Sequence, residues 1–167
     1  LPLLLNEYKF YDEKDIETYL YLLNVIPSTF QEYVSFENTK ANNGYGMPDF
    51  VIDKVINQCD DFLNNIENHF LIKTFEDRIK DVELENYSKD FLIKLNYENI
   101  KSELAYGFEI IKNSLQTLYG QARNNLGLSY YDIGKDYYTY LFQNETGYNI
   151  KINDAITYIE EKLTENY

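Results

Sequence analysis

The sequence predicts an all-α protein: an antiparallel, bundle-like domain of several helices, with at most one short extended segment near residues 126–133. Three observations predict this fold. Apolar residues recur every three or four positions through most of the 167 residues, as on one face of a helix. Capping residues, prolines and glycines interrupt this spacing where helices would begin and end. The hydrophobic fraction of 44% is enough for a buried core. One domain over residues 1–167 is expected.

The first two expected helices lie between Asp12 and the turn at residues 42–44. Asp12 is placed to cap a helix, and Pro27 is expected to end it because proline lacks a backbone N–H. Ser28, with Gln31 three residues later, is expected to form a capping box for a second helix. The apolar positions before the proline follow helical spacing: Ile16, Tyr19, Leu20, Leu23 and Ile26.

Two further helical stretches follow Pro48, which suits the first position of a helix. The first has one apolar face, made of Ile52, Val55, Cys59, Phe62 and Ile66. Because Cys59 is the only cysteine and lies on this face, we expect a buried, unreactive thiol and no intrachain disulfide. The second stretch is less regular and ends at a break near residues 85–87.

The longest apolar series is expected to form a helix from about Tyr97 to Gln121, after a shorter stretch that Ser88 begins. Its apolar positions are Ile100, Leu104, Phe108, Ile111, Leu115 and Leu118. Gly107 interrupts this helix off the apolar face, where it would permit the close approach of another helix. Turn-forming residues then break the pattern between residues 122 and 134. A final pair of helices is expected, from Lys135 to about Glu145 with a stop at Gly147, and after a cap at Asn153.

Composition limits the classes of partner. The net charge is −13, and the 15 basic residues are scattered, which argues against binding to nucleic acid or an anionic membrane surface. No apolar run is long enough for a membrane-spanning segment. The 18 tyrosines fit two explanations, a bias in coding composition or a tyrosine-lined groove for a peptide or sugar. The sequence opens with Leu1 rather than Met, so we expect a piece of a longer protein, whose export signal or lipid anchor would lie upstream.

Catalytic chemistry is not predicted from these residues. A catalytic zinc ion needs three protein ligands, usually His or Glu, but the chain has a single histidine, His69. We expect His69 to be a helix cap or a surface residue, with no metal ligand, no catalytic residue and no cofactor in this chain. Nucleophile-elbow and phosphate-loop motifs are also absent from the sequence.

One segment is a candidate binding site: Gly134, Lys135, Tyr137 and Tyr138, which follow a glycine-rich loop and open a helix. Backbone N–H groups at the helix start and the tyrosine hydroxyls would bind the carboxylate or backbone of a peptide. The alternative is structural, with Tyr137, Tyr138 and Leu141 packed in the core and Gly134 permitting the turn. Both interpretations stay open from the sequence.

Two blocks of the chain resemble the bacterial domain-of-unknown-function 885 family. The first covers Glu7–Cys59 and includes Gly44-Tyr-Gly-Met-Pro-Asp49; the second covers about Gly120–Gly147 and includes Gly134-Lys-Asp-Tyr-Tyr138. The resemblance implies a helical zinc-metallopeptidase-like protein, often a lipoprotein, with its His/Glu zinc motif further toward the C-terminus. None of those zinc ligands can be carried onto this sequence.

The resemblance therefore implies that this chain is a non-catalytic scaffold and substrate-cleft segment. Its partners would be the rest of the parent polypeptide and a peptide substrate, and zinc would belong to the parent alone. An extracellular or cell-envelope location is favoured over a cytoplasmic one. The alternative is a stand-alone extracellular or lipoprotein-associated helical module that binds a peptide or protein through a tyrosine-rich face.

Overall fold

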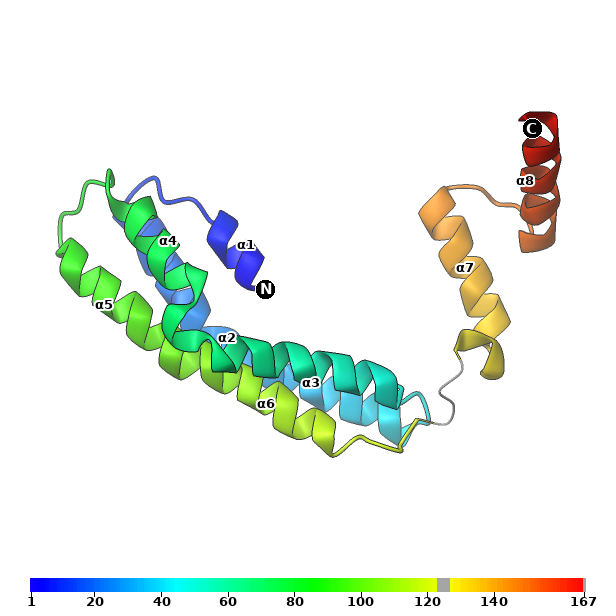
Figure 1. Cartoon of the computed structure of the whole chain (residues 1–167), viewed down its shortest axis with the longest axis horizontal. Helices are drawn as coiled ribbons and strands as arrows, with labels where there is room; N and C mark the ends of the chain where they lie inside the picture. The colour runs from blue at the N-terminus through cyan, green and yellow to red at the C-terminus, as the bar shows by residue number, and fades with distance from the viewer. Residues whose placement is uncertain (123–126, 167) are drawn as a thin grey trace. The chain divides into compact units, whose positions relative to one another are not determined.

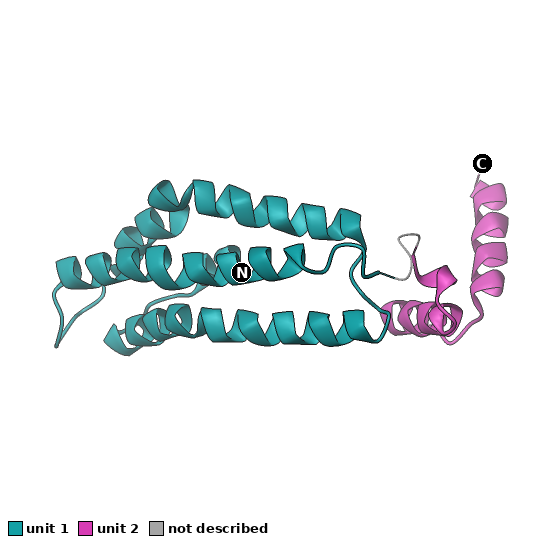
Figure 2. Ribbon diagram, turned by 90° about the horizontal axis from the view of Figure 1, so that it is seen from below, with its two compact units in different colours: residues 1–123 teal, residues 124–167 magenta. Residues whose placement is uncertain are grey.

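The computed structural model describes residues 1–122 and 127–166, and within these the regular secondary structure is helical (Figure 1). An isolated antiparallel bridge joins Tyr45 to Ala122, and no strand occurs among the described residues. The prediction of an all-α fold is confirmed. The chain divides into two compact units, Leu1–Arg123 and Asn124–Tyr167 (Figure 2), so the expectation of one domain stays a prediction.

Unit 1 is a bundle of three helical rods. The first is α2 (Glu13–Asn42); the second is α3 (Asp49–Asn64) with α4 (Phe70–Ile79); the third is α5 (Lys89–Asn99) with α6 (Ala105–Gln116). Short α1 (Pro2–Glu7) precedes them, and a 3-10 turn (Ile66–Asn68) joins α3 to α4. The second rod runs antiparallel to the other two (Figures 1 and 2). This arrangement follows from the tight turns at residues 43–48 and 80–88, which reverse the chain at opposite ends of the unit.

The expected break at Pro27 is wrong, because Pro27 lies inside α2, which is a continuous helix of 30 residues. Proline removes only one helical hydrogen bond, and packing on both sides of it keeps the helix intact. Ile26 and Phe30 are buried against the third rod at the position of Gly107. Ser28 is not a cap, since its hydroxyl donates to the carbonyl oxygen of Val25 within the same helix (2.8 Å).

The third rod begins earlier than expected and contains an irregular turn. Helix α5 leads into a π-helical segment, Ile100–Leu104, which leads directly into α6, so no break occurs at Tyr97. The π segment buries both Ile100 and Leu104 completely. Beyond it, Gly107 makes the close approach predicted for it: a Cβ there would lie 2.9 Å from Cγ2 of Ile26.

Capping side chains begin several of these helices as predicted. Asp12 accepts a hydrogen bond from the backbone N–H of Asp15 (3.0 Å), and Ser88 accepts one from Phe91 (3.2 Å). Pro48 is the residue before α3 rather than its first residue. The predicted cap at Asn153 is wrong by two positions, because α8 already begins at Ile152.

The core of unit 1 contains two groups of packed aromatic rings. Near α1, Phe10 packs edge-on against Tyr19 (5.3 Å between ring centroids) and Phe75 (5.5 Å). In the middle of the bundle, Phe62 stacks on Phe108 at 4.1 Å. Cys59 is buried on α3, and burial raises the pKa of its thiol, as expected for an unreactive cysteine.

Unit 2 contains a 3-10 turn (Leu128–Tyr130), α7 (Gly134–Thr146) and α8 (Ile152–Asn166). In the region where a short extended segment was allowed, the 3-10 turn is followed by Tyr131 with an extended backbone and by a turn at residues 132–133; residue 126 lies outside the described residues. Helix α7 ends at Gly147 in the left-handed conformation (φ 71°), as the sequence predicts. In the part of the chain that the structure describes, no helix is long and apolar enough to span a membrane.

Candidate functional site

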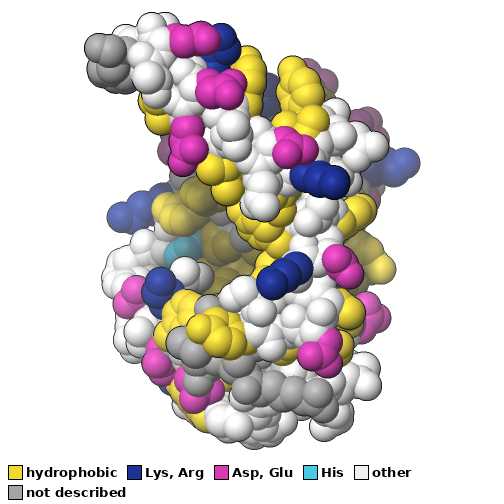
Figure 3. Space-filling model, turned by 90° about the vertical axis from the view of Figure 1, so that its right-hand side faces the viewer, with side chains coloured by type: hydrophobic (Ala, Val, Ile, Leu, Met, Phe, Trp, Pro, Cys, Tyr) yellow, Lys and Arg dark blue, Asp and Glu magenta, His cyan; other side chains and the backbone are white. Residues whose placement is uncertain are grey.

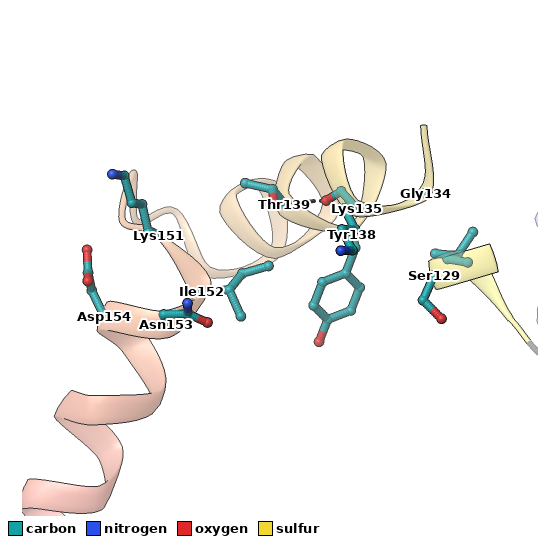
Figure 4. A pocket seen from close by; sticks show the side chains of 10 residues that line it. Ser129, Gly134, Lys135, Tyr138, Thr139, Lys151, Ile152, Asn153 and Asp154 are labelled. Carbon is teal, nitrogen blue, oxygen red and sulfur yellow. Dashed lines mark hydrogen bonds between the residues drawn. The ribbon is translucent and has the colours of Figure 1, made fainter. Parts of the chain in front are cut away.

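Unit 2 holds a cleft of about 730 Å³ that contains three of the four candidate site residues: Gly134, Lys135 and Tyr138. They come from the first two turns of α7. Thr139 of α7 also lines the cleft, and the 3-10 turn and the segment that begins α8 supply the other walls: Leu128, Ser129, Lys151, Ile152, Asn153 and Asp154. Tyr137 does not line the cleft. In Figure 4 the ring of Tyr138 points into the space between Ser129 and Ile152.

Backbone hydrogen bonds and a close contact with Leu128 of the 3-10 turn fix the start of α7. The backbone N–H of Gly134 donates to the carbonyl oxygen of Tyr131 (2.9 Å), and Tyr137 N–H donates to Ile133 (2.9 Å). A Cβ at Gly134 would overlap the carbonyl oxygen of Leu128, at 1.5 Å. Only glycine therefore fits here, and because it has no side chain, the 3-10 turn can lie directly against the helix.

The tyrosines of α7 are exposed, so the alternative of core packing is wrong for the two candidate rings. Tyr137 is 46% exposed and Tyr138 is 52% exposed. On the adjoining helix face, Tyr137 stacks with Tyr140 at 6.3 Å between centroids. Large apolar rings that stay open to solvent on one helix are typical of a contact surface for a ligand or partner.

The polar lining of the cleft consists of four neutral residues and three charged ones, the latter being Lys135, Lys151 and Asp154. The hydroxyl of Tyr138, the hydroxyl of Ser129 and the amide of Asn153 belong to its lining, whereas Leu128 and Ile152 are apolar. Figure 4 shows the side chains of Lys151 and Asp154 turned away from Tyr138. Such a mixture suits a ligand with its own amide or hydroxyl groups and short apolar side chains.

Lysine and arginine side chains do not gather into a patch on the face of the molecule in Figure 3, where acidic and hydrophobic side chains lie between them. This distribution agrees with the scattered basic residues of the sequence and its net charge of −13. A contiguous cationic surface, which nucleic acid requires, is not seen on this face.

The residues that the structure describes do not form a zinc-ligand set. His69 caps α4, where its Nδ1 atom accepts a hydrogen bond from the backbone N–H of Leu71 (3.4 Å), and its ring lies against Phe62 and Phe70. Burial lowers the pKa of His69 below its ordinary value of 6.5. Within residues 1–122 and 127–166, no three His, Cys, Asp or Glu side chains form a group able to hold a metal ion.

A family model described as bacterial protein of unknown function (DUF885) matches residues 1–165. The chain belongs to the DUF885 family. The resemblance found from the sequence blocks is therefore confirmed as to family, and the match includes both units of this DUF885 chain. No curated protein and no solved structure matches it.

Sequence reasoning missed seven residues that line the cleft of the DUF885 chain, among them Ser129, Ile152 and Asn153. Ile152 and Asn153 are far from Gly134 in sequence, and the glycine stop at residue 147 is the signal that turns the chain back toward it. Nothing in the local pattern around Ser129 distinguishes it from other loop serines.

Proposed function

We propose that this DUF885 chain is a non-catalytic helical scaffold and substrate-cleft segment of a larger zinc-metallopeptidase-like protein. The observation that carries the proposal is the cleft around Tyr138, formed by the same Gly-Lys-Asp-Tyr-Tyr element that carries the family resemblance. Peptide is the ligand class that matches its lining, because neutral hydroxyl and amide groups bond to peptide N–H and C=O while Leu128 and Ile152 contact small side chains.

The zinc chemistry of this proposal belongs to residues outside the present chain. The single histidine is engaged as a helix cap, and its Nδ1 already accepts a backbone hydrogen bond. Moreover, the described carboxylates do not gather with it into a ligand set. In the parent protein, this chain would hold the peptide and exclude water along one wall while other residues bind the metal.

Two measurements on this chain test the non-catalytic part of the proposal. Metal analysis of the purified protein should find no stoichiometric zinc after dialysis against buffer, and a peptidase assay with zinc added should show no turnover. Tightly bound zinc at one equivalent would contradict the proposal. In the gene, a His-Glu…His motif should follow the codon for Tyr167, and a stop codon at that point would contradict the proposed parent.

A second candidate is a stand-alone module that binds a peptide or protein through a tyrosine-rich face. The observation in its favour is the exposure of tyrosines in unit 2, which includes Tyr130, Tyr137, Tyr138, Tyr140, Tyr148 and Tyr158. The two candidates differ in what removes binding. Tyr140 lies outside the cleft, so Tyr140→Ala should weaken peptide binding only if the tyrosine-rich face is the binding surface. Tyr138→Ala should weaken peptide binding under either candidate function.

A further inference from the structure

The lining of the unit 2 cleft carries an excess of positive charge. Its charged residues are two lysines, Lys135 and Lys151, and one aspartate, Asp154, whereas the whole chain has a net charge of −13. By contrast, a cavity of similar volume in unit 1, about 690 Å³, is lined by six carboxylates and one lysine. Of these two cavities, the one in unit 2 is therefore the more favourable for a negatively charged ligand group.

Lys135 is the charged lining residue nearest in the helix to Tyr138. The two are three positions apart on α7, so their side chains share one face of the helix. The ring of Tyr138 points into the cleft, whereas the side chains of Lys151 and Asp154 are turned away from it (Figure 4). Residues at this helical spacing have Cβ atoms about 5–6 Å apart, so one small ligand group can reach both Lys135 and Tyr138.

Both side chains are available to a ligand. None of the ion pairs among the described residues includes Lys135. The hydroxyl of Tyr138 has no hydrogen-bond partner in the part of the chain that the structure describes, and the residue is 52% exposed. The backbone N–H of Gly134 differs, because it already donates to the carbonyl oxygen of Tyr131. The two side chains are thus better placed than this N–H group to bind a ligand.

We propose that Lys135 and Tyr138 bind a carboxylate of the peptide, which rests on the peptide-binding function proposed above. One carboxylate oxygen would accept from Nζ of Lys135 and the other from the hydroxyl of Tyr138. The positive amino terminus of a peptide fits this position less well, because the lysine repels it. The peptide's amide groups would bond to Ser129 and Asn153, which line the same cleft. The carboxylate is that of the peptide's C-terminus or of an acidic side chain, and the test separates these two sources.

The test compares three peptides by NMR titration of the full chain, with the backbone amide signal of Gly134 as the measure of affinity. The peptides are tetraalanine, tetraalanine amide and the amide of Ala-Ala-Glu-Ala. Tetraalanine should bind about fivefold more tightly than its amide, the order expected for one exposed charge pair, and high salt should reduce this preference. If the glutamate peptide binds like tetraalanine, any carboxylate is accepted; if it binds like tetraalanine amide, the C-terminus is the group that is bound.

Lys135→Met keeps most of the side-chain stem and removes its charge, so tetraalanine and its amide should bind this variant equally. Lys162→Met is the matched control, because it removes a lysine of α8 that does not line the cleft, and it should keep the fivefold preference. Circular dichroism verifies that each variant is folded.

Two results overturn the carboxylate assignment and leave peptide binding intact. One is equal affinity of the parent chain for tetraalanine and its amide, and the other is a preference for tetraalanine that persists in Lys135→Met. If none of the three peptides shifts the Gly134 signal saturably, the proposed peptide binding fails, and the carboxylate assignment fails with it.

Discussion

The close approach of α2 and α6 predicts an unusual response to Gly107→Ala. Alanine is favoured over glycine in a helix interior by about 1 kcal/mol, so at an ordinary position this change stabilises a protein. At Gly107, however, the new Cβ would lie 2.9 Å from Cγ2 of Ile26 and 3.1 Å from Cδ2 of Phe30. The Cγ2 atom belongs to a β-branched side chain that cannot easily rotate away.

Overpacking of this kind costs about 1–3 kcal/mol. With helix propensity subtracted, we expect Gly107→Ala to lower the free energy of unfolding by about 1 kcal/mol. In an Ile26→Ala background the closest contact is gone while the Phe30 ring stays 3.1 Å away, so the same change should lower that free energy less than in the parent chain. Urea unfolding followed by circular dichroism at 222 nm measures all four proteins. A stabilising effect of Gly107→Ala in the parent chain would refute the close packing of these helices.

Three further predictions concern titratable groups. Hydrogen bonds from the backbone and side chain of Asn86 lower the pKa of Glu13 from its ordinary value of 4.5. The ionised Glu13 side chain therefore stabilises the fold above pH 4.5, and this stabilisation is lost as the pH falls through the folded-state pKa. Glu13→Gln should flatten this part of an acid-unfolding curve. Burial lowers the pKa of His69 below its ordinary value of 6.5. The free energy of unfolding should therefore fall as the pH drops from about 6.5 through the folded-state pKa. Urea midpoints measured against pH should show this fall in the parent chain and not in His69→Gln. Cys59 should react with iodoacetamide far more slowly in the folded protein than in urea, as mass spectrometry can follow; equal rates would show that the thiol is accessible.

Helical periodicity was sufficient to predict the fold class and several helix ends, although the helix expected to reach Gln121 already ends at Gln116. The spacing of apolar residues, the caps at Asp12 and Ser88 and the stop at Gly147 are local signals, and the structure bears them out. Pro27 failed as a signal because its cost is local, whereas the packing of Ile26 and Phe30 that keeps α2 whole comes from residues far along the chain.

The candidate site was predicted only in part, for a related physical reason. Gly134, Lys135 and Tyr138 are neighbours along one helix, so a motif could bring them together. The opposite wall depends on how the chain turns back after Gly147, which no pattern in α7 specifies.

The central claim is that the cleft of unit 2 binds a peptide, and an NMR titration with tetraalanine tests it most directly. The amide signals of Gly134 and Lys135 should shift saturably in the parent chain and in Tyr140→Phe, and should not shift in Tyr138→Ala. Unchanged amide signals around Gly134 at saturating peptide, or equal shifts in Tyr138→Ala, would contradict the account.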